Sequence, residues 1–102
     1  MKFFVKSQRN VVPMPPERAV GLYQGAKEWI NARVADGTID CVYSFSDLSG
    51  GMSIGNADSP EELLDLLVDY PLWPFFGWEI KPVSDFDHAM DKLTEFAKKL
   101  AG

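Results

Sequence analysis

The sequence is short of the residues on which cross-links and most metal sites depend. It has one cysteine, Cys41, and one histidine, His88, among 102 residues. A single cysteine cannot form a disulfide within the chain, and the two residues do not have the spacing of a metal-binding motif. We therefore expect no metal site and a reducing compartment, the cytoplasm. Cys41 is expected to pack as a small core side chain, and His88 to lie exposed on a helix.

Positive charge and long apolar runs are also scarce. Ten lysines and arginines stand against fifteen acidic residues, a formal net charge of −5, and the basic residues are scattered along the chain. This distribution argues against nucleic acid as a partner, because a phosphate backbone is attracted by clustered cations. No run approaches the roughly 18 apolar residues that cross a bilayer, and the N-terminus lacks a run of signal-peptide length. We expect a soluble, unexported protein without membrane association.

The apolar residues that are present recur at two different spacings. A spacing of three to four residues is typical of helices, and alternation is typical of strands. The order is strand, helix, strand, strand, helix, strand and a final helix, at residues 2–8, 17–34, 38–45, 52–57, 60–70, 75–83 and 84–102. This order predicts a ferredoxin-like α+β fold, in which two helices cover one face of a four-stranded antiparallel sheet. We expect a single domain over residues 1–102, with residues 1–83 as the core and residues 84–102 as a C-terminal helix.

Two of the predicted helices begin with capping residues. Ser59 precedes Pro60 and is followed three residues later by Glu62, which predicts a capping box. Ser84 has Asp87 three residues further on, and this pair predicts the start of the last helix.

The predicted strands carry apolar residues on both faces of the sheet. Alternation places Ile39, Cys41, Tyr43 and Phe45 on one side of their strand and Val42 on the other, and it separates Phe75 from Phe76, Trp78 and Ile80. Two helices cover only one face, so the other face needs a second cover. We expect this open face to pair with that of a second copy in a homodimer. The alternative is that the C-terminal helix folds over the open face of its own sheet.

Residues 53–80 combine several short motifs. They are a strand with Ser53 and Ile54, an Asp-Ser-Pro-x-Glu-Leu helix start at 58–63, a Leu-Leu pair at 66–67, a Pro-Leu-aromatic-Pro-aromatic run at 71–75, and Glu79 beside Ile80. In this combination the chain resembles the muconolactone isomerases, and a weaker likeness extends the match over residues 1–83. The resemblance implies a ferredoxin-like subunit that pairs into a dimeric α/β barrel, often within a larger ring. It also implies an isomerase without a cofactor that acts on a small carboxylated lactone.

The implied reaction moves a proton between two carbons next to a conjugated carbonyl. Such a reaction needs a base, donors that stabilise the enolate oxygen, and a cation for the substrate carboxylate. Glu79 is the candidate base, Lys27 the candidate cation and Tyr43 a candidate donor. Each also has a structural explanation, as a solvated carboxylate, a lysine whose stem covers the core, and a tyrosine bonded to the backbone. For substrate binding we expect Tyr23, Ser53, Trp73, Phe76 and Trp78.

The chain departs from the family pattern where further cations are expected. It has Tyr23, Gly25, Cys41, Ser44 and Leu48 at the corresponding places. We therefore expect an isomerase or cyclase that shifts a proton in a small carbonyl-conjugated molecule. Two alternatives remain open, a non-catalytic small-molecule-binding or assembly domain of the same fold and a cofactor-free oxygenase.

Overall fold

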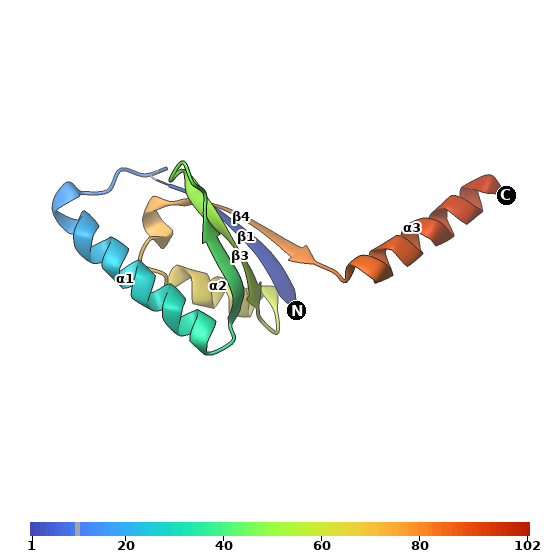
Figure 1. The fold of residues 1–102 in the computed structure, drawn as a ribbon, viewed down its shortest axis with the longest axis horizontal. Helices are drawn as coiled ribbons and strands as arrows, with labels where there is room; N and C mark the ends of the chain where they lie inside the picture. Colours follow the sequence, from blue (N-terminus) through green and yellow to red (C-terminus); the bar gives the residue numbers. More distant parts are fainter. Residues whose placement is uncertain (10) are drawn as a thin grey trace.

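The chain folds as a four-stranded sheet with two helices on one face and a third helix that extends away (Figure 1). This computed structural model describes residues 1–9 and 11–102. The elements are β1 (Lys2–Gln8), α1 (Pro16–Ala35), β2 (Ile39–Ser44), β3 (Gly50–Asn56), α2 (Pro60–Val68), the 3-10 helix η1 (Trp73–Phe75), β4 (Gly77–Val83) and α3 (Phe86–Ala101). The strands lie in the order β2-β3-β1-β4, and every neighbouring pair is antiparallel. The predicted ferredoxin-like α+β fold is confirmed.

The buried core lies between β1 and α2. Phe3 and Val5 alternate on β1 and pack against Leu63 and Leu67, which are one helical turn apart on α2. Burying an apolar side chain of this size stabilises the folded state by about 1.5–3 kcal/mol. This cluster therefore fixes α2 against the sheet and defines the face of the sheet that the helices cover.

α1 is held less closely than α2. It has 20 residues, and only Ala26 among them is buried. Its last turn lies over the beginning of β2, which follows through the turn at Gly37, where φ is +84°. A glycine suits this position because a left-handed residue ends a helix at little steric cost when it has no Cβ.

A β-bulge at Asp40 determines which side chains of β2 face the helices. Ile39 and Cys41 pair with successive residues of β3, so Asp40 is an extra residue between them. Ile39 is buried on the helix face, whereas Cys41 lies half-buried on the open face together with Tyr43. Val42 then returns to the helix face. The prediction that Ile39 shares a face with Cys41 and Tyr43 is therefore wrong. Strict alternation does not allow for an inserted residue, which moves Ile39 to the opposite face.

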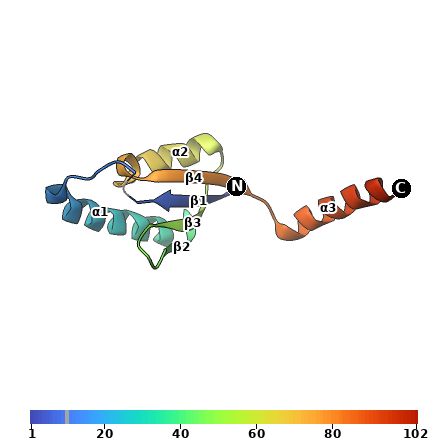
Figure 2. The ribbon, with the colours of Figure 1, turned by 90° about the horizontal axis from the view of Figure 1, so that it is seen from above.

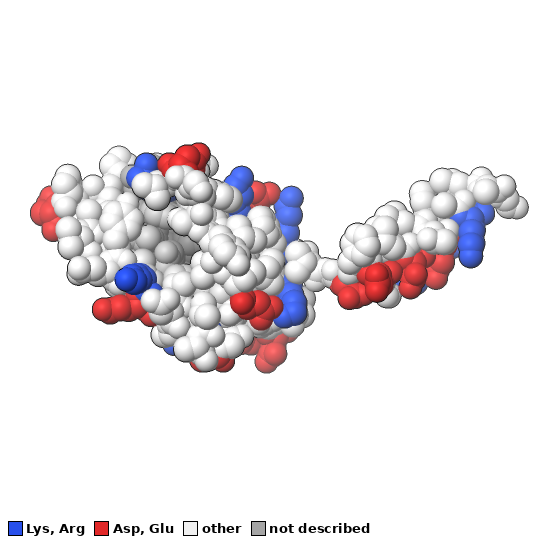
Figure 3. All heavy atoms as spheres, viewed as in Figure 1, with Lys and Arg blue, Asp and Glu red and all other residues white. Residues whose placement is uncertain are grey.

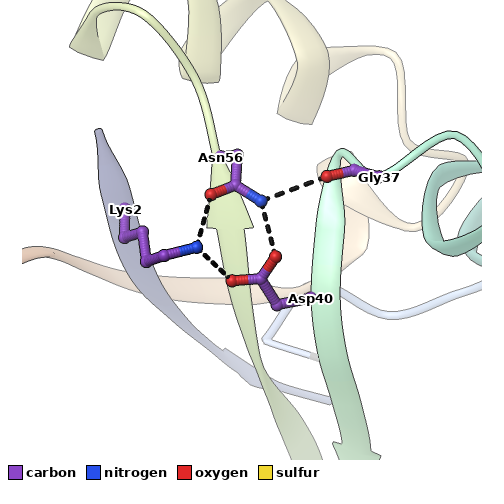
Figure 4. A network of polar contacts seen from close by, with 4 residues as sticks. All are labelled: Lys2, Gly37, Asp40 and Asn56. Carbon is purple, nitrogen blue, oxygen red and sulfur yellow. Dashed lines mark hydrogen bonds and ion pairs between the residues drawn. The ribbon is translucent and has the colours of Figure 1, made fainter.

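A network of polar contacts surrounds the bulge (Figure 4). Lys2 Nζ donates a hydrogen bond to Oδ2 of Asp40 and another, of 2.9 Å, to Oδ1 of Asn56. Asn56 Nδ2 donates to Oδ1 of Asp40 at 2.7 Å and to the Gly37 carbonyl oxygen at 3.1 Å. These contacts join β1, β2, β3 and the turn after α1. The Lys2 ammonium, followed by the Asn56 amide, holds the pKa of the Asp40 carboxyl below its usual range.

Side chains cap α2 and α3. Ser59 Oγ accepts a hydrogen bond of 3.1 Å from the backbone amide of Glu62, which confirms the predicted start of α2. The Glu62 carboxylate accepts from the amide of Asp58 at 3.1 Å and so satisfies a second amide group at this end. The predicted cap at Ser84 is wrong by one residue. Asp85 caps α3, because its carboxylate accepts from a backbone amide three residues further on.

β4 begins at Gly77 and not at the predicted Phe75. The preceding segment, Trp73–Phe75, turns as the 3-10 helix η1. The ring of Trp78 stacks on that of Trp73, with centroids 5.2 Å apart, and its Nε1 donates to the Trp73 carbonyl oxygen at 3.2 Å. These contacts hold η1 against the start of β4 and put Trp78 on the helix face.

α3 leaves the end of β4 and runs away from the rest of the molecule (Figures 1 and 2). The molecule measures 64 × 27 × 24 Å as a result. All residues of α3 except Ala89 are exposed. The alternative in which this helix covers the open face of its own sheet is therefore wrong for the structure.

None of the helices within the described residues has the length and apolar character to cross a membrane.

The first prediction concerns the close approach of β1 and β3 at Gly50. A Cβ at Gly50 would lie 1.9 Å from the carbonyl oxygen of Ser7, so a larger residue must displace one strand. We expect Gly50→Ala to lower the free energy of unfolding by about 1–3 kcal/mol, as overpacking does, in urea denaturation. Gly21→Ala is the control, since no atom lies within 4 Å of that Cβ. Equal effects of the two substitutions would contradict this explanation.

The second prediction concerns the pH dependence of the Asp40 network. The pKa of Asp40 is lowered by folding, so its carboxylate stabilises the folded state above the unfolded pKa of about 3.9. We expect Asp40→Asn to destabilise the protein near neutral pH, and the difference from wild type to disappear as the pH falls below about 4. Urea denaturation at several pH values measures this difference. In a Lys2→Met background the difference is expected to be smaller, and an unchanged difference would rule out the ion pair as its source.

Candidate functional site

A cavity of about 630 Å³ lies on the helix face of the sheet, between the sheet, α1 and α2. The space-filling view shows the hollow beside α1 (Figure 3). It exists because α1 is packed loosely, whereas α2 is fixed by the buried cluster on β1. Val5, Ile30, Leu66 and Leu72 contribute apolar surface from four parts of the chain. The size and the mainly apolar lining are typical of a site for a small organic molecule.

The charged groups that line the cavity are cations. Lys27 comes from α1, and Arg9 follows β1 in sequence. Among the described lining residues there is no carboxylate and no imidazole. Within the described part of the chain Lys27 forms no ion pair. Hydrogen bonds from Ser49 lower the pKa of the Asp47 carboxyl, and the nearby charge of Arg9 lowers it slightly further. The cavity therefore favours a ligand with a negative charge, and Lys27 is the cation most available to it.

Tyr70 is the most strongly perturbed titratable group in the cavity. Its ring lies 5.2 Å from the ring of Trp29 and 5.7 Å from that of Trp78, in an edge-on arrangement. Burial, together with the nearby phenol of Tyr23, raises the pKa of Tyr70 to about 12. A tyrosine hydroxyl is protonated at neutral pH in any case, and the raised pKa keeps that of Tyr70 protonated far into the alkaline range, so that it can donate a hydrogen bond to a ligand oxygen.

Six of the residues predicted for the site line this cavity. They are Tyr23, Lys27, Tyr43, Ser53, Phe76 and Trp78. They come from α1, from the strands β2, β3 and β4, and from the segment before β4. Trp73 stacks behind Trp78 and is not among the lining residues.

Tyr43 borders the cavity in a different way. It pairs with Met52, one position along from the pair of Val42 and Ser53 that faces the helices. Its position in the register therefore lies on the open face, and the residue is 68% exposed while also being among the residues that line the cavity. Its predicted role as a donor stays a prediction that needs a ligand on the open face.

Glu79 lies on the face of the sheet opposite to the cavity. It pairs with Lys6 of β1, between Trp78 and Ile80, which point toward the helices. Its carboxylate is half-exposed and forms an ion pair of 3.2 Å with Lys81. Glu79 and the cavity of the same subunit are therefore separated by the sheet, and the predicted role of Glu79 as the base stays untested.

Most of the lining residues were not predicted from the sequence, and Arg9 and Tyr70 are the two among them that matter most for binding a polar ligand. Arg9 continues the alternation of Phe3, Val5 and Ser7 along β1, so the period of two was a usable signal for its position. Tyr70 was assigned only to the end of the second helix. It faces the cavity because α2 ends at Val68, earlier than predicted, and no local pattern indicates where the following turn directs the ring.

Within the described residues, no group of three or more histidine, cysteine, aspartate or glutamate side chains is placed to hold a metal ion. The side-chain oxygen and nitrogen atoms of the lining residues belong to serines, a threonine, tyrosines, tryptophans, amides and two cations. Such groups bind organic anions and carbonyl oxygens through hydrogen bonds.

The fold has counterparts among solved structures. A muconolactone isomerase superposes with a TM-score of 0.75 and is 27% identical, over 83% of this chain and 90% of that one. The chain is thus similar to a muconolactone isomerase in fold and, modestly, in sequence. A 5-chloro-2-hydroxyhydroquinone dehydrochlorinase from Burkholderia phenoliruptrix AC1100, in complex with 2,5-dihydroxybenzoquinone, superposes with a TM-score of 0.67 at 15% identity, over 86% and 98% of the two chains. This second likeness shows the fold alone.

The muconolactone isomerase-like character confirms the resemblance that the motifs at residues 53–80 predicted. No protein-family model matches the chain, and no curated protein sequence matches it significantly. The similarity to a muconolactone isomerase therefore rests on the shared fold and on 27% sequence identity.

The third prediction concerns the titration of Tyr70. Because its pKa is raised to about 12, its phenol should ionise later than an ordinary tyrosine, whose pKa is about 10. We expect the tyrosinate absorbance of the wild type and of Tyr70→Phe to coincide up to about pH 10 and to diverge only at higher pH. Ultraviolet pH titration of the folded protein measures this. A difference that appears below pH 10 would show that Tyr70 is not buried as described.

Proposed function

We propose that this protein is a cofactor-independent isomerase or cyclase that shifts a proton in a small, carbonyl-conjugated, lactone-like molecule carrying a carboxylate. The observation that carries the proposal is a cavity lined by Lys27 and by the protonated phenol of Tyr70, in a muconolactone isomerase-like subunit. A cation for a carboxylate and a neutral donor for a carbonyl oxygen are two of the three groups that the reaction needs.

In this proposal Lys27 binds the carboxylate of the substrate, and Arg9 adds positive charge to the same cavity. Tyr70 donates a hydrogen bond to the conjugated carbonyl. When a base, for which Glu79 is the candidate, takes a proton from the neighbouring carbon, negative charge moves to that carbonyl oxygen, and a donor fixed in apolar surroundings stabilises the charge more than water would. Tyr23 and Ser53 are further polar groups for orienting the substrate, and Phe76 and Trp78 contact its apolar part.

The third group that the reaction needs is a base to take the proton. Glu79 is the residue assigned to this role from the sequence, and its carboxylate lies on the opposite face of the sheet, paired with Lys81. The described lining of the cavity offers no other carboxylate. This observation favours a second candidate function, a non-catalytic domain that binds small carboxylates with the same Lys27 and Tyr70.

We also propose that the subunit forms a homodimer through its open face, as a dimeric α/β barrel in a reducing cytoplasm. Phe4, Cys41, Met52 and Ile54 lie on this face and are each only half-buried in the single chain. The pairing of two such faces removes this apolar surface from water and follows the twofold symmetry of most homodimers.

The fourth prediction tests the role of Lys27. Purified protein is incubated in heavy water with muconolactone-type acids, and deuterium incorporation and isomer formation are followed by NMR. Loss of a hydrogen bond to a charged group weakens an interaction by about 1.5–3 kcal/mol. We therefore expect Lys27→Gln to lower kcat/KM by about tenfold or more, whereas Lys99→Gln, on the exposed side of α3, should leave it unchanged.

Methyl esters of the same acids serve as a second control. If esters react as fast as the acids, or if Lys99→Gln is as damaging as Lys27→Gln, Lys27 does not recognise a carboxylate. Binding that depends on Lys27 without any exchange of deuterium would support the non-catalytic alternative and contradict the isomerase.

A further inference from the structure

Aromatic side chains gather along one side of the cavity. Those of Trp29, Tyr70, Phe76 and Trp78 line it together, and we call these four residues the aromatic wall. The ring centroids are 5.2 Å apart for Trp29 and Tyr70, 5.7 Å for Tyr70 and Trp78, and 6.3 Å for Trp78 and Phe76. The wall combines α1, the turn after α2 and the beginning of β4, so it is formed by segments that are distant in the sequence.

The aromatic wall is not part of the buried core. None of its four residues is buried, whereas Phe3 in the core is only 2% exposed. Tilted and edge-on contacts stabilise pairs of aromatic rings. Rings that stay partly uncovered inside a cavity can form the same contacts with a ligand, so the wall offers a surface for a further ring.

Lys27 lines the cavity from the other side of α1. The ring of Trp29 contacts Tyr70, and one turn earlier a Cβ at Gly25 would lie 3.7 Å from Cγ of Pro71. This side of α1 therefore faces the turn after α2. Lys27 precedes Trp29 by two residues, which places the two side chains about 200° apart around the helix. The ammonium of Lys27 is therefore on the side of α1 away from the aromatic wall.

The second cation of the cavity, Arg9, lies beside the turn between β2 and β3. Its backbone amide donates a hydrogen bond of 2.7 Å to the carbonyl oxygen of Ser49, and its charge acts on the Asp47 carboxyl. Both cations are thus separate from the aromatic wall. The cavity has an aromatic side toward α2 and β4, and a cationic side toward β2 and its turn.

The floor of the cavity extends between these two sides. Trp78 pairs with Ser7, Ser7 with Gly51, and Gly51 with Ser44, and all four line the cavity. Three strand spacings of about 4.8 Å make this row roughly 14 Å long. At the roughly 30 Å³ that a water molecule occupies in the liquid, 630 Å³ corresponds to about 20 non-hydrogen atoms, about twice what a single carboxylated lactone ring contains.

We propose that the ligand of this cavity is an aryl-substituted oxo acid, with its carboxylate at Lys27, its carbonyl oxygen at the hydroxyl of Tyr70 and its aromatic ring on the aromatic wall. The inference rests on the proposed function for the carboxylate and the carbonyl, and it adds the ring to them. Tyr70 lies between Trp29 and Trp78 in the wall, so a ring attached directly to the bound carbonyl is next to both.

A carboxylate with a flexible alkyl chain is the competing ligand, because it would also fill an apolar cavity with a cation on one side. Two properties of the wall favour a ring. Edge-on and stacked contacts between rings contribute beyond the area that they bury. A rigid ring also loses less conformational freedom on binding than an alkyl chain of the same number of carbons.

Isothermal titration calorimetry of the intact protein with three saturated, unreactive oxo acids tests the proposal. The acids are 3-benzoylpropionate, levulinate, which has a methyl group in place of the ring, and 4-oxodecanoate, which has a hexyl chain in its place. We expect 3-benzoylpropionate to bind at least about tenfold more tightly than levulinate. It should also bind about threefold or more tightly than 4-oxodecanoate. Its methyl ester, which has no charge for Lys27, should bind about tenfold more weakly than the acid.

Equal affinities of 3-benzoylpropionate and levulinate, tighter binding of 4-oxodecanoate, or no binding of any of the acids at millimolar concentration would each overturn the proposal. The outcome is distinguishable from that of the isomerase proposal. A preference for the ring without deuterium exchange would uphold this inference and reject the isomerase, whereas exchange in muconolactone-type acids without a preference for the ring would do the reverse.

Substitution of the wall identifies where the ring binds. Trp29→Leu and Phe76→Leu each remove a ring of the wall, so we expect the Kd for 3-benzoylpropionate to rise by about fivefold or more, and the Kd for levulinate to change by less than about twofold. Phe75→Leu is the matched control, because Phe75 is adjacent in sequence and does not line the cavity. It should leave both constants unchanged.

Equal effects of Phe75→Leu and Phe76→Leu would contradict the aromatic wall as the binding surface. NMR of the wild-type complex decides the same point without substitutions. We expect nuclear Overhauser effects between the phenyl protons of 3-benzoylpropionate and the ring protons of Trp29 and Phe76. Such effects at residues of the open face alone would overturn the proposal.

Discussion

The candidate site depends on the bulge at Asp40, which Lys2 and Asn56 hold in place. Without the extra residue, Val42 would lie on the open face and Tyr43 inside the cavity. The contacts of Asp40 also connect β2 with β1 and with the turn after α1, so they fix the edge strand relative to the helix that forms one wall of the cavity. Exposed ion pairs stabilise proteins little. The pair of Lys2 and Asp40 matters because it holds the bulge, and so the faces of the β2 side chains, in place.

The cavity itself follows from unequal packing of the two helices. Leu63 and Leu67 fix α2 against β1, while α1 buries only Ala26. The space between them brings together a cation and a protonated tyrosine without a carboxylate among the described lining residues. Such an arrangement can bind an anion and stabilise charge on a carbonyl oxygen, and it requires another source of the base before it can move a proton.

The fold was predictable because its signals are local and repeated. The two spacings of apolar residues gave the order of elements, and Ser59 marked the start of α2. The motifs at residues 53–80 gave the muconolactone isomerase-like resemblance. The candidate site was less predictable, because a single inserted residue at Asp40 changes which side chains share a face. Alternation separates Glu79 from Trp78 and Ile80, but which of these two faces the helices cover depends on how the strands pair. The position of Tyr70 depends on a turn without a sequence signature.

The central claim is that a carboxylated, conjugated ligand binds on the helix face of the sheet, between Lys27 and Tyr70. NMR titration of the intact, isotope-labelled protein with such a ligand tests this directly. The account predicts saturable shift changes at Lys27, Ser53 and Tyr70, with little change at Glu79 and Lys81. Shift changes centred on Glu79 and Lys81, with none at Lys27, would place the ligand on the open face and contradict the account.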